Sequence, residues 1–368
     1  MNSSAGLSLI VCLLCVTSQS RAGVIYNVGL LPGGTFTFGG GFGVSATGLI
    51  GVGSGNSSTY SGQPYYWTPG GGIHGITLPQ GYTFGSLGRM SADGAFAAGY
   101  MYNTGGFDQA VRWSLAGGIQ GLGYLPGQGS SVPNGISANG SVVVGYGTDI
   151  LGHDQAFRWT QSGGMVGLGK LSGFANSFAN NVSRDGSIVV GENYNPTNSM
   201  AFKWTQSTGM SSLGRLPGDL FSQALAVSGD GSVVVGMSAT DSQHEQAFRW
   251  TAQTGMTGLG FLPGSDSSET TGITEDGTVI VGNCDAGFIW DATHGMRDLR
   301  SYLQSAGVDV SAWSELAVGN ISADGTIMSG LGYFAGGGTQ GWIAVIPEPA
   351  TMNLLLLGGL AGWVRRKR

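Results

Sequence analysis

Hydrophobic residues occur along the chain in short runs separated by turn-forming residues, rather than at the spacing of an amphipathic helix. Val233–Val235 is one such run, and an uninterrupted apolar run of this length is typical of a strand covered on both faces. An Asp-Gly or Asn-Gly pair precedes most runs, which favours a tight hairpin with positive φ at both central residues. These pairs are Asp93-Gly94, Asn139-Gly140, Asp185-Gly186, Asp230-Gly231, Asp276-Gly277 and Asp324-Gly325.

Tryptophan marks a long repeat that contains these hairpins. It stands at Trp67, Trp113, Trp159, Trp204, Trp250, Trp290 and Trp342, with gaps of 46, 46, 45, 46, 40 and 52 residues. A phrase such as Gln-Ala-Phe-Arg precedes most of these residues, and Gly-Met-x-x-Leu-Gly-x-Leu follows. Together with the hairpin, each unit of about 46 residues therefore predicts four short strands, which is typical of a β-propeller blade.

The units number seven, and the two ends of the series complement each other. The last unit has no fourth strand after Gln340–Ala344, whereas Val24–Leu30 resembles a fourth strand that precedes any first one. We therefore expect an all-β, seven-bladed propeller closed by the N-terminal strand, which would bury an exposed sheet edge. A β-solenoid is the alternative fold. Residues Arg300–Ala312 fall outside the repeat and predict an insertion, with a helix as one option.

Composition agrees with a turn-rich β protein. The 368 residues include 70 Gly and 36 charged residues. Glycine costs about 1 kcal/mol in a helix interior, which excludes a coiled coil or helical bundle. The absence of a Gly-X-Y period excludes collagen, and 41% apolar residues argue against disorder.

The two ends of the chain predict export and membrane sorting. Residues 1–22 resemble a secretory signal peptide cleaved after Ala22, which would leave Cys284 as the one cysteine of residues 23–346. Residues 347–368 contain an apolar stretch, Leu354–Val364, of eleven residues, shorter than the roughly 20 residues of a stable membrane helix. We expect transient anchoring in the inner membrane by this short transmembrane segment, with its basic end in the cytoplasm.

The C-terminal segment resembles the PEP-CTERM sorting tail of Gram-negative bacteria. Three elements occur in the family's order: Pro347, Glu348 and Pro349, then the apolar stretch, then the basic cluster Arg365, Arg366, Lys367 and Arg368. The resemblance implies that an exosortase recognises and removes the tail after export by the secretion machinery. The body would then be released or attached at the cell surface.

The repeats of residues 24–346 resemble the extracellular HAF family. They share its Leu-Pro-Gly, Asp-Gly-Ser-Val-Val-Val-Gly and Ala-Phe-Arg-Trp phrases, although Ser45–Gly48 replaces the first Asp-Gly turn. The resemblance implies secretion and supplies no catalytic residues.

The candidate chemical groups are few and dispersed. Each repeated turn has one acid, without the second carboxylate that a calcium loop needs, so a role in forming the turn explains these residues. The four histidines (His74, His153, His244 and His294) form no metal-binding pair, and we expect no metal, cofactor or catalytic site. Without Arg21 and the four C-terminal basic residues, 10 basic residues face 21 acidic ones; this net charge of −11 argues against nucleic acid.

Two repeated features remain open between structural and binding roles. Arg112, Arg158, Lys203 and Arg249 recur before Trp, and an acid precedes three of them by four residues, which predicts ion pairs within a blade or a ring for an anionic ligand. Aromatic residues occur where the second strands end, and they suit carbohydrate binding and loop packing equally. These are Tyr100, Tyr102, Phe107, Tyr146 and Tyr194.

Together these features predict a secreted cell-surface or extracellular-matrix protein without enzymatic activity, with exopolysaccharide as its candidate ligand. The alternative is a secreted polysaccharide hydrolase or lyase with its site in the propeller funnel. Two carboxylates, or a His, Arg and Tyr set, at one mouth of the propeller would favour the enzyme.

Overall fold

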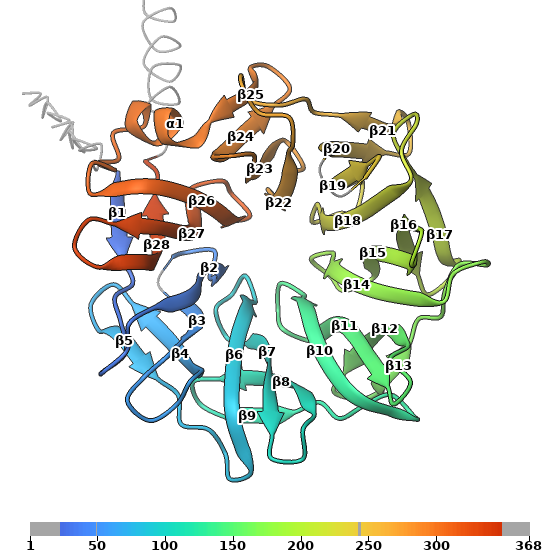
Figure 1. The fold of residues 1–368 in the computed structure, drawn as a ribbon, viewed down its shortest axis with the longest axis horizontal. Coiled ribbons are helices and arrows are strands. Elements are labelled where there is room, and N and C mark those ends of the chain that lie inside the picture. The colour runs from blue at the N-terminus through green and yellow to red at the C-terminus, as the bar shows by residue number, and fades with distance from the viewer. Residues whose placement is uncertain (1–22, 49, 242–243, 348–368) are drawn as a thin grey trace, which may run out of the picture. The chain divides into compact units, whose positions relative to one another are not determined.

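The computed structural model describes residues 23–48, 50–241 and 244–347. Residues 23–346 form seven four-stranded antiparallel sheets, the blades, which are arranged around a central axis (Figure 1). The strands of blades 1 to 7, in sheet order, are as follows: β2 (Thr37–Val44), β3 (Gly51–Gly55), β4 (Gln63–Thr68), β5 (Gly72–Gly75); β6 (Tyr82–Met90), β7 (Ala97–Asn103), β8 (Asp108–Ser114), β9 (Gly118–Gly121); β10 (Gln128–Ile136), β11 (Val142–Asp149), β12 (Asp154–Thr160), β13 (Gly164–Gly167); β14 (Asn176–Val182), β15 (Ile188–Asn195), β16 (Asn198–Thr205), β17 (Gly209–Gly214); β18 (Phe221–Val227), β19 (Val233–Ala239), β20 (Glu245–Thr251), β21 (Gly255–Gly258); β22 (Glu269–Ile273), β23 (Val279–Asn283), β24 (Gly287–Asp291), β25 (Gly295–Asp298); and β26 (Trp313–Ile321), β27 (Ile327–Phe334), β28 (Gly338–Val345), β1 (Val24–Asn27).

The N-terminal strand closes the ring, as the sequence predicts. β1 pairs antiparallel with β28, from Val24 opposite Val345 to Asn27 opposite Trp342. Strands from the two ends of the repeat series thus share one blade, and Figure 1 shows blue β1 beside the red and orange strands of blade 7. The seven-bladed propeller is confirmed, and the solenoid alternative is wrong.

A glycine in the second strand of six blades permits a bulge in the first strand. At Gly236, an added Cβ would lie 1.8 Å from the backbone oxygen of Gln223, so only glycine fits. The pairing register of β18 with β19 shifts immediately afterwards, between Ala224 and Ala226. Bulges of this kind bend a strand and redirect its next side chain, and here the redirected position lies at the propeller axis.

The hairpin turns differ from the predicted type. Among the described residues, positive φ occurs only at glycines, such as Gly231 (φ 72°), so the preceding aspartates keep ordinary backbone angles. Asp230 instead acts through its side chain, which accepts hydrogen bonds from the Ser228 hydroxyl (2.8 Å) and the Ser232 backbone N–H (2.9 Å). A four-residue loop stabilised by a carboxylate therefore replaces the expected two-residue turn.

The hydrophobic core lies between neighbouring blades. Phe202 of blade 4 is fully buried and packs in one cluster with Val142 and Val144 of blade 3. Helix α1 (Leu299–Ser305) begins one residue before the predicted insertion, and its buried Leu299 and Leu303 belong to the cluster between blades 6 and 7. Each blade thus packs against a neighbour on both of its faces. Closure of the ring therefore completes the hydrophobic core.

Candidate axial site and its relation to known proteins

The repeated basic residues connect neighbouring blades rather than pairing within one blade. Arg158 donates from Nε to the carbonyl of Gly186 (3.1 Å), and Lys203 donates from Nζ to that of Gly231 (2.7 Å). Arg112 makes the same contact with Gly140 (3.0 Å), again 28 residues later. The predicted intrablade ion pairs are wrong, because four strand residues span about 13 Å. These contacts support a structural role for the repeated cations.

The predicted aromatic residues divide into packed and exposed groups. Tyr146 and Tyr194 both pack on Phe178, with ring centroids 4.2 and 5.0 Å away, and Tyr100 stacks on Phe84 at 6.0 Å. Tyr102 and Phe107 are 42% and 44% exposed at the loop between β7 and β8. These two remain available for a ligand.

The histidines make local contacts. His74 stacks on Tyr66 at 4.8 Å, and the other three each contact an aspartate of their own loop. Within the described residues, no three or more His, Cys, Asp or Glu side chains gather in an arrangement that could hold a metal ion.

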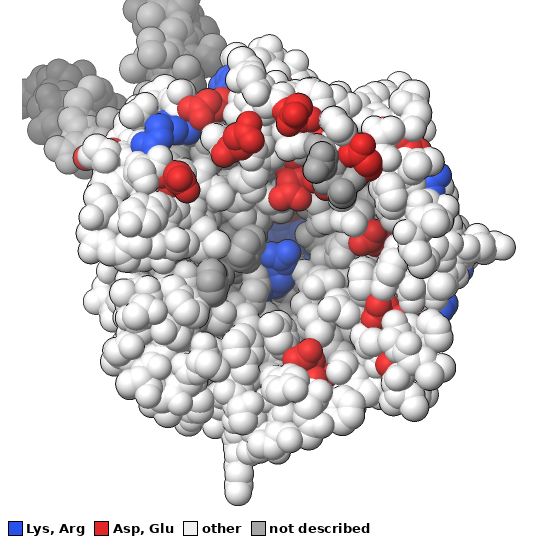
Figure 2. Space-filling model, in the orientation of Figure 1, with Lys and Arg blue, Asp and Glu red and all other residues white. Residues whose placement is uncertain are grey.

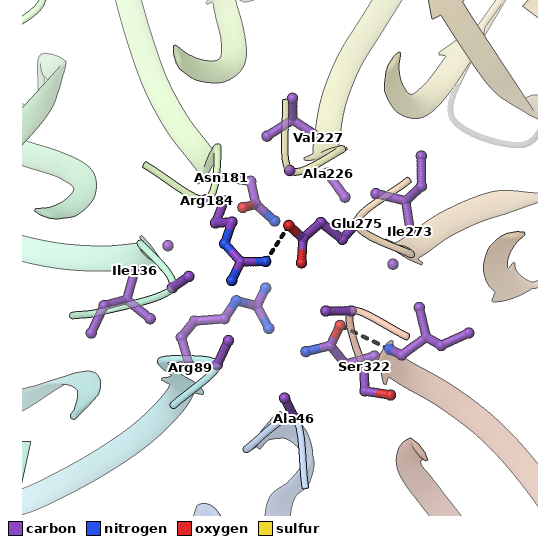
Figure 3. Close-up of a pocket in the computed structure, with 18 of the residues that line it drawn as sticks. Ala46, Arg89, Ile136, Asn181, Arg184, Ala226, Val227, Ile273, Glu275 and Ser322 are labelled. Atoms are coloured by element: carbon purple, nitrogen blue, oxygen red, sulfur yellow. Dashed lines mark hydrogen bonds and ion pairs between the residues drawn. The ribbon is translucent and has the colours of Figure 1, made fainter. Parts of the chain in front are cut away.

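A cavity of about 170 Å³ lies on the propeller axis and is lined by all seven first strands and their turns. Two positions of blades 2 to 7 face it. We call the residue after the bulge the bulge position, and the residue before the turn Asp or Asn the pre-turn position. Blade 1 contributes Val44 and Ala46, and Ala46 occupies its pre-turn position. Gly or Ala occupies three of the six bulge positions and four of the six pre-turn positions in blades 2 to 7. The exceptions define the site: Arg89, Asn181 and Asn320 at the bulge position, and Arg184 and Glu275 at the pre-turn position. Figure 3 labels Arg89, Asn181, Arg184 and Glu275.

The charged exceptions are held in two ways. Arg184 and Glu275 form an ion pair across the axis, with 59% and 34% of their side chains exposed (Figure 3). The Arg89 side chain donates from Nε to the carbonyl of Asn134 of the next blade (2.8 Å). Desolvation by the surrounding protein lowers the pKa of its guanidinium. An arginine nevertheless stays protonated at neutral pH, so the cavity contains two cations and one anion.

Backbone hydrogen bonds connect the pre-turn residues around the axis. The N–H of Arg184 donates to the carbonyl of Gly229 (3.2 Å), and the N–H of Gly229 donates to the carbonyl of Glu275 (2.8 Å). Glu275 donates to Ala323 (2.9 Å) in the same manner. These bonds hold the side chains of Arg184 and Glu275 on a fixed frame.

A second group of acids lies away from the axis, in blades 3 and 4. Glu192 is 7% exposed, and desolvation raises its pKa to about 7 although Gln223 and Ser199 donate hydrogen bonds to it. The Tyr194 hydroxyl donates to Asp154, which also accepts from Thr148 Oγ1 (2.6 Å). Desolvation and the carboxylate of Asp154 raise the pKa of Tyr194, so this tyrosine stays neutral.

The axial residues were not predicted, although the sequence contains a signal for them. When the repeats are aligned on their Asp-Gly turns, the pre-turn position reads Ala or Gly in five blades and Arg184 or Glu275 in the others. The recurring residues form the turns and the contacts between blades, whereas the axial site consists of residues that break the repeat.

The predicted sorting residues lie almost wholly outside the described residues. Pro347 is described, whereas Ala22, Glu348, Pro349 and the basic cluster Arg365, Arg366, Lys367 and Arg368 are not. Neither the predicted signal peptide nor the predicted membrane segment is described, and within the described part of the chain no helix is long and apolar enough to cross a membrane.

Residues 345–368 match the PEP-CTERM protein-sorting motif. The motif indicates a secreted protein that is anchored in the membrane, recognised by an exosortase and cleaved. No curated protein matches the chain, and the likeness of its repeats to the HAF family stays a prediction.

Solved structures resemble the propeller at low sequence identity. An oligogalacturonate lyase in complex with manganese shares 14% identity with a TM-score of 0.59, and the match covers 90% of this chain and 95% of the lyase. The lyase from Vibrio parahaemolyticus gives 12%, 0.60 and the same coverage. The Swd1 propeller domain from Myceliophteria thermophila gives 9% and 0.51, with 88% and 100% covered. These likenesses concern the fold alone.

Proposed function

We propose that this protein acts without enzymatic activity at the cell surface or in the extracellular matrix, where it binds exopolysaccharide after exosortase sorting. The sorting motif supports the location. The proposal rests chiefly on the axial cavity, whose one carboxylate, Glu275, is paired with Arg184.

The use of the repeated acids supports a non-catalytic role. Glycoside hydrolysis generally needs two carboxylates, one of them free to give or take a proton. Hydrogen bonds from the turn lower the pKa of Asp185 and Asp230, so both are stable anions. Their side chains serve the turns rather than proton transfer.

The exposed aromatic residues support carbohydrate binding. Tyr102 and Phe107 flank a loop that Asn103 organises, because its Oδ1 accepts hydrogen bonds from the N–H groups of Gly105 (2.8 Å) and Phe107 (3.1 Å). Flat apolar rings in a fixed loop form a platform for the apolar faces of sugar rings.

Retention on immobilised exopolysaccharide, together with a glycan array, tests this proposal. The wild-type exported protein is expected to bind at least one polymer and to leave its chain length unchanged. Replacement of both Tyr102 and Phe107 by Ala should reduce retention. Tyr333→Ala, at a 51% exposed tyrosine of blade 7, is the matched control and should not. Binding of no polymer, or depolymerisation, would contradict the proposal.

A second candidate, a polysaccharide hydrolase or lyase, is favoured by one pair of acids. Burial raises the pKa of Glu269 and the nearby charge of Glu245 adds to the effect, while burial also raises the pKa of Glu245. Neighbouring carboxyls with raised pKa values are typical of acid–base sites. Release of reducing or unsaturated ends by the wild-type protein, abolished in Glu269→Gln, would establish this alternative.

A further inference from the structure

The axial cavity contains charged residues that the propeller fold does not require. Gly and Ala are eight of the 21 residues that line it, and these small residues occupy five of the seven pre-turn positions. Arg89, Arg184 and Glu275 therefore add charge to the axis where the repeat itself demands none.

The charge of the cavity opposes that of the propeller. Residues 23–349 have a net charge of −11, whereas two guanidinium groups and one carboxylate line the cavity. Figure 2 shows basic side chains at the bottom of the central hollow and acidic side chains on the surface around it. Walls of low dielectric constant strengthen the field of such a recessed charge.

The size of the cavity limits what enters. Sites for drug-sized ligands measure about 300–1,000 Å³, whereas this cavity of about 170 Å³ accommodates one small group. A polymer could thus place a single sugar unit at the axis, with the rest of its chain across the mouth.

We infer that the axial cavity binds the carboxylate of a sugar acid, so that the exopolysaccharide recognised is an acidic one. This inference deepens the proposed function and rests on it. The planar guanidinium of Arg89 matches a carboxylate in a bidentate hydrogen-bonded pair. The ligand carboxylate competes with Glu275 for Arg184, which is 59% exposed and lines the cavity. Asn181 lines the same wall. Its Oδ1 accepts from the Val182 N–H (2.7 Å) and its Nδ2 donates to the Leu225 carbonyl (3.4 Å), so its second Nδ2 hydrogen serves a sugar hydroxyl.

Calorimetric titration of the exported protein with glucuronate, glucose and inorganic sulfate tests the inference. Glucuronate is expected to bind, and glucose and sulfate to bind at least tenfold more weakly. Arg89→Met should weaken glucuronate binding by about 10- to 100-fold, the value of one charged hydrogen-bonded pair. Arg158→Met removes an arginine outside the cavity and should leave the affinity unchanged.

Glu275→Gln supplies a second variant that does not depend on the folding of Arg89→Met. Removal of the competing carboxylate should tighten glucuronate binding by up to about fivefold, since exposed ion pairs contribute about 0.2–1 kcal/mol. An affinity unaffected by Arg89→Met and Glu275→Gln would overturn the inference. So would glucose or sulfate binding as tightly as glucuronate.

The polymer assay separates this inference from the proposed function. Full retention of polysaccharide by a folded Arg89→Met variant would overturn the axial site and leave polysaccharide binding intact. Arg89-dependent glucuronate binding by a protein that retains no polymer would establish the axial site and overturn the proposed function.

Discussion

The turn aspartates and the residues directly before them occupy adjacent positions of the repeat, yet they have different roles. Asp230 recurs in equivalent form in most blades and is held by its own turn. The residue before it is Gly229, whereas the corresponding residues of blades 4 and 6 are Arg184 and Glu275, which meet across the axis. The comparison shows that the recurring turn aspartates stabilise the propeller, whereas Arg184 and Glu275, which break the repeat at the adjacent position, line its cavity.

The largest loss of stability is expected where the bulge is formed. In Gly99→Ala, the new Cβ would lie 2.0 Å from the backbone oxygen of Ser86, beside the bulge that positions Arg89. Because backbone cannot move aside cheaply, we expect a loss of about 3 kcal/mol in the free energy of unfolding. Gly118→Ala in the same blade meets open space at φ 64° and should cost only about 1–2 kcal/mol. Denaturant titration measures both; equal losses would contradict the role of the glycine in the bulge.

A pH-dependent loss of stability is expected from Glu192, a buried acid that is also absent from the other repeats. Its pKa of about 7 in the folded state exceeds the ordinary 4.5. Glu192 therefore lowers the free energy of unfolding least below pH 4.5, where it is protonated in both states, and lowers it more as the pH rises through 7. Glu192→Gln should therefore stabilise the protein at pH 8 by about 2–3 kcal/mol relative to pH 4. Unfolding curves at the two pH values test this; a difference that does not depend on pH would argue against a buried neutral carboxyl.

A smaller effect is expected at the repeated turns. Asp230→Ala removes two hydrogen bonds and should lower the free energy of unfolding by about 1 kcal/mol at pH 7. Hydrogen bonds lower the pKa of Asp230, so its contribution is present above the ordinary pKa and is lost as the pH falls through the folded value. The difference between wild type and variant should accordingly shrink in acid, and thermal unfolding at pH 7 and pH 2.5 measures it.

The smallest effect on stability is expected at the axial ion pair. Arg184 and Glu275 are partly exposed, so Glu275→Gln should change the free energy of unfolding by less than about 0.5 kcal/mol. A loss above about 2 kcal/mol would place this pair among the structural charges and remove the distinction between the two positions.

Much of the fold could be predicted from the sequence, because repetition makes local signals reinforce one another. Runs such as Val233–Val235 give the second strands, and the unmatched segment at Val24 gives the closing strand. The partners of Arg158 and Lys203 could not be predicted, since they lie 28 residues later in the next blade. The bulges were equally hidden, because a glycine that ends a valine run resembles a strand terminus.

Prediction of the axial site requires both the sequence and the closed ring of blades. Arg89 and Arg184 lie in different repeats and at different repeat positions, and only closure of seven blades brings them to one cavity. The sequence shows that a charged residue replaces Gly or Ala at these two positions. That the two side chains meet in one cavity depends on the three-dimensional arrangement of the blades.

Melting temperature and retention on an acidic exopolysaccharide, measured side by side for Asp230→Ala and Arg89→Met, test the distinction between the two kinds of charge most directly. We predict that Asp230→Ala melts at a lower temperature and is retained like wild type. Arg89→Met should instead melt at a higher temperature than Asp230→Ala and lose retention. Unchanged retention in folded Arg89→Met, or parallel losses of stability and retention in both variants, would contradict the account.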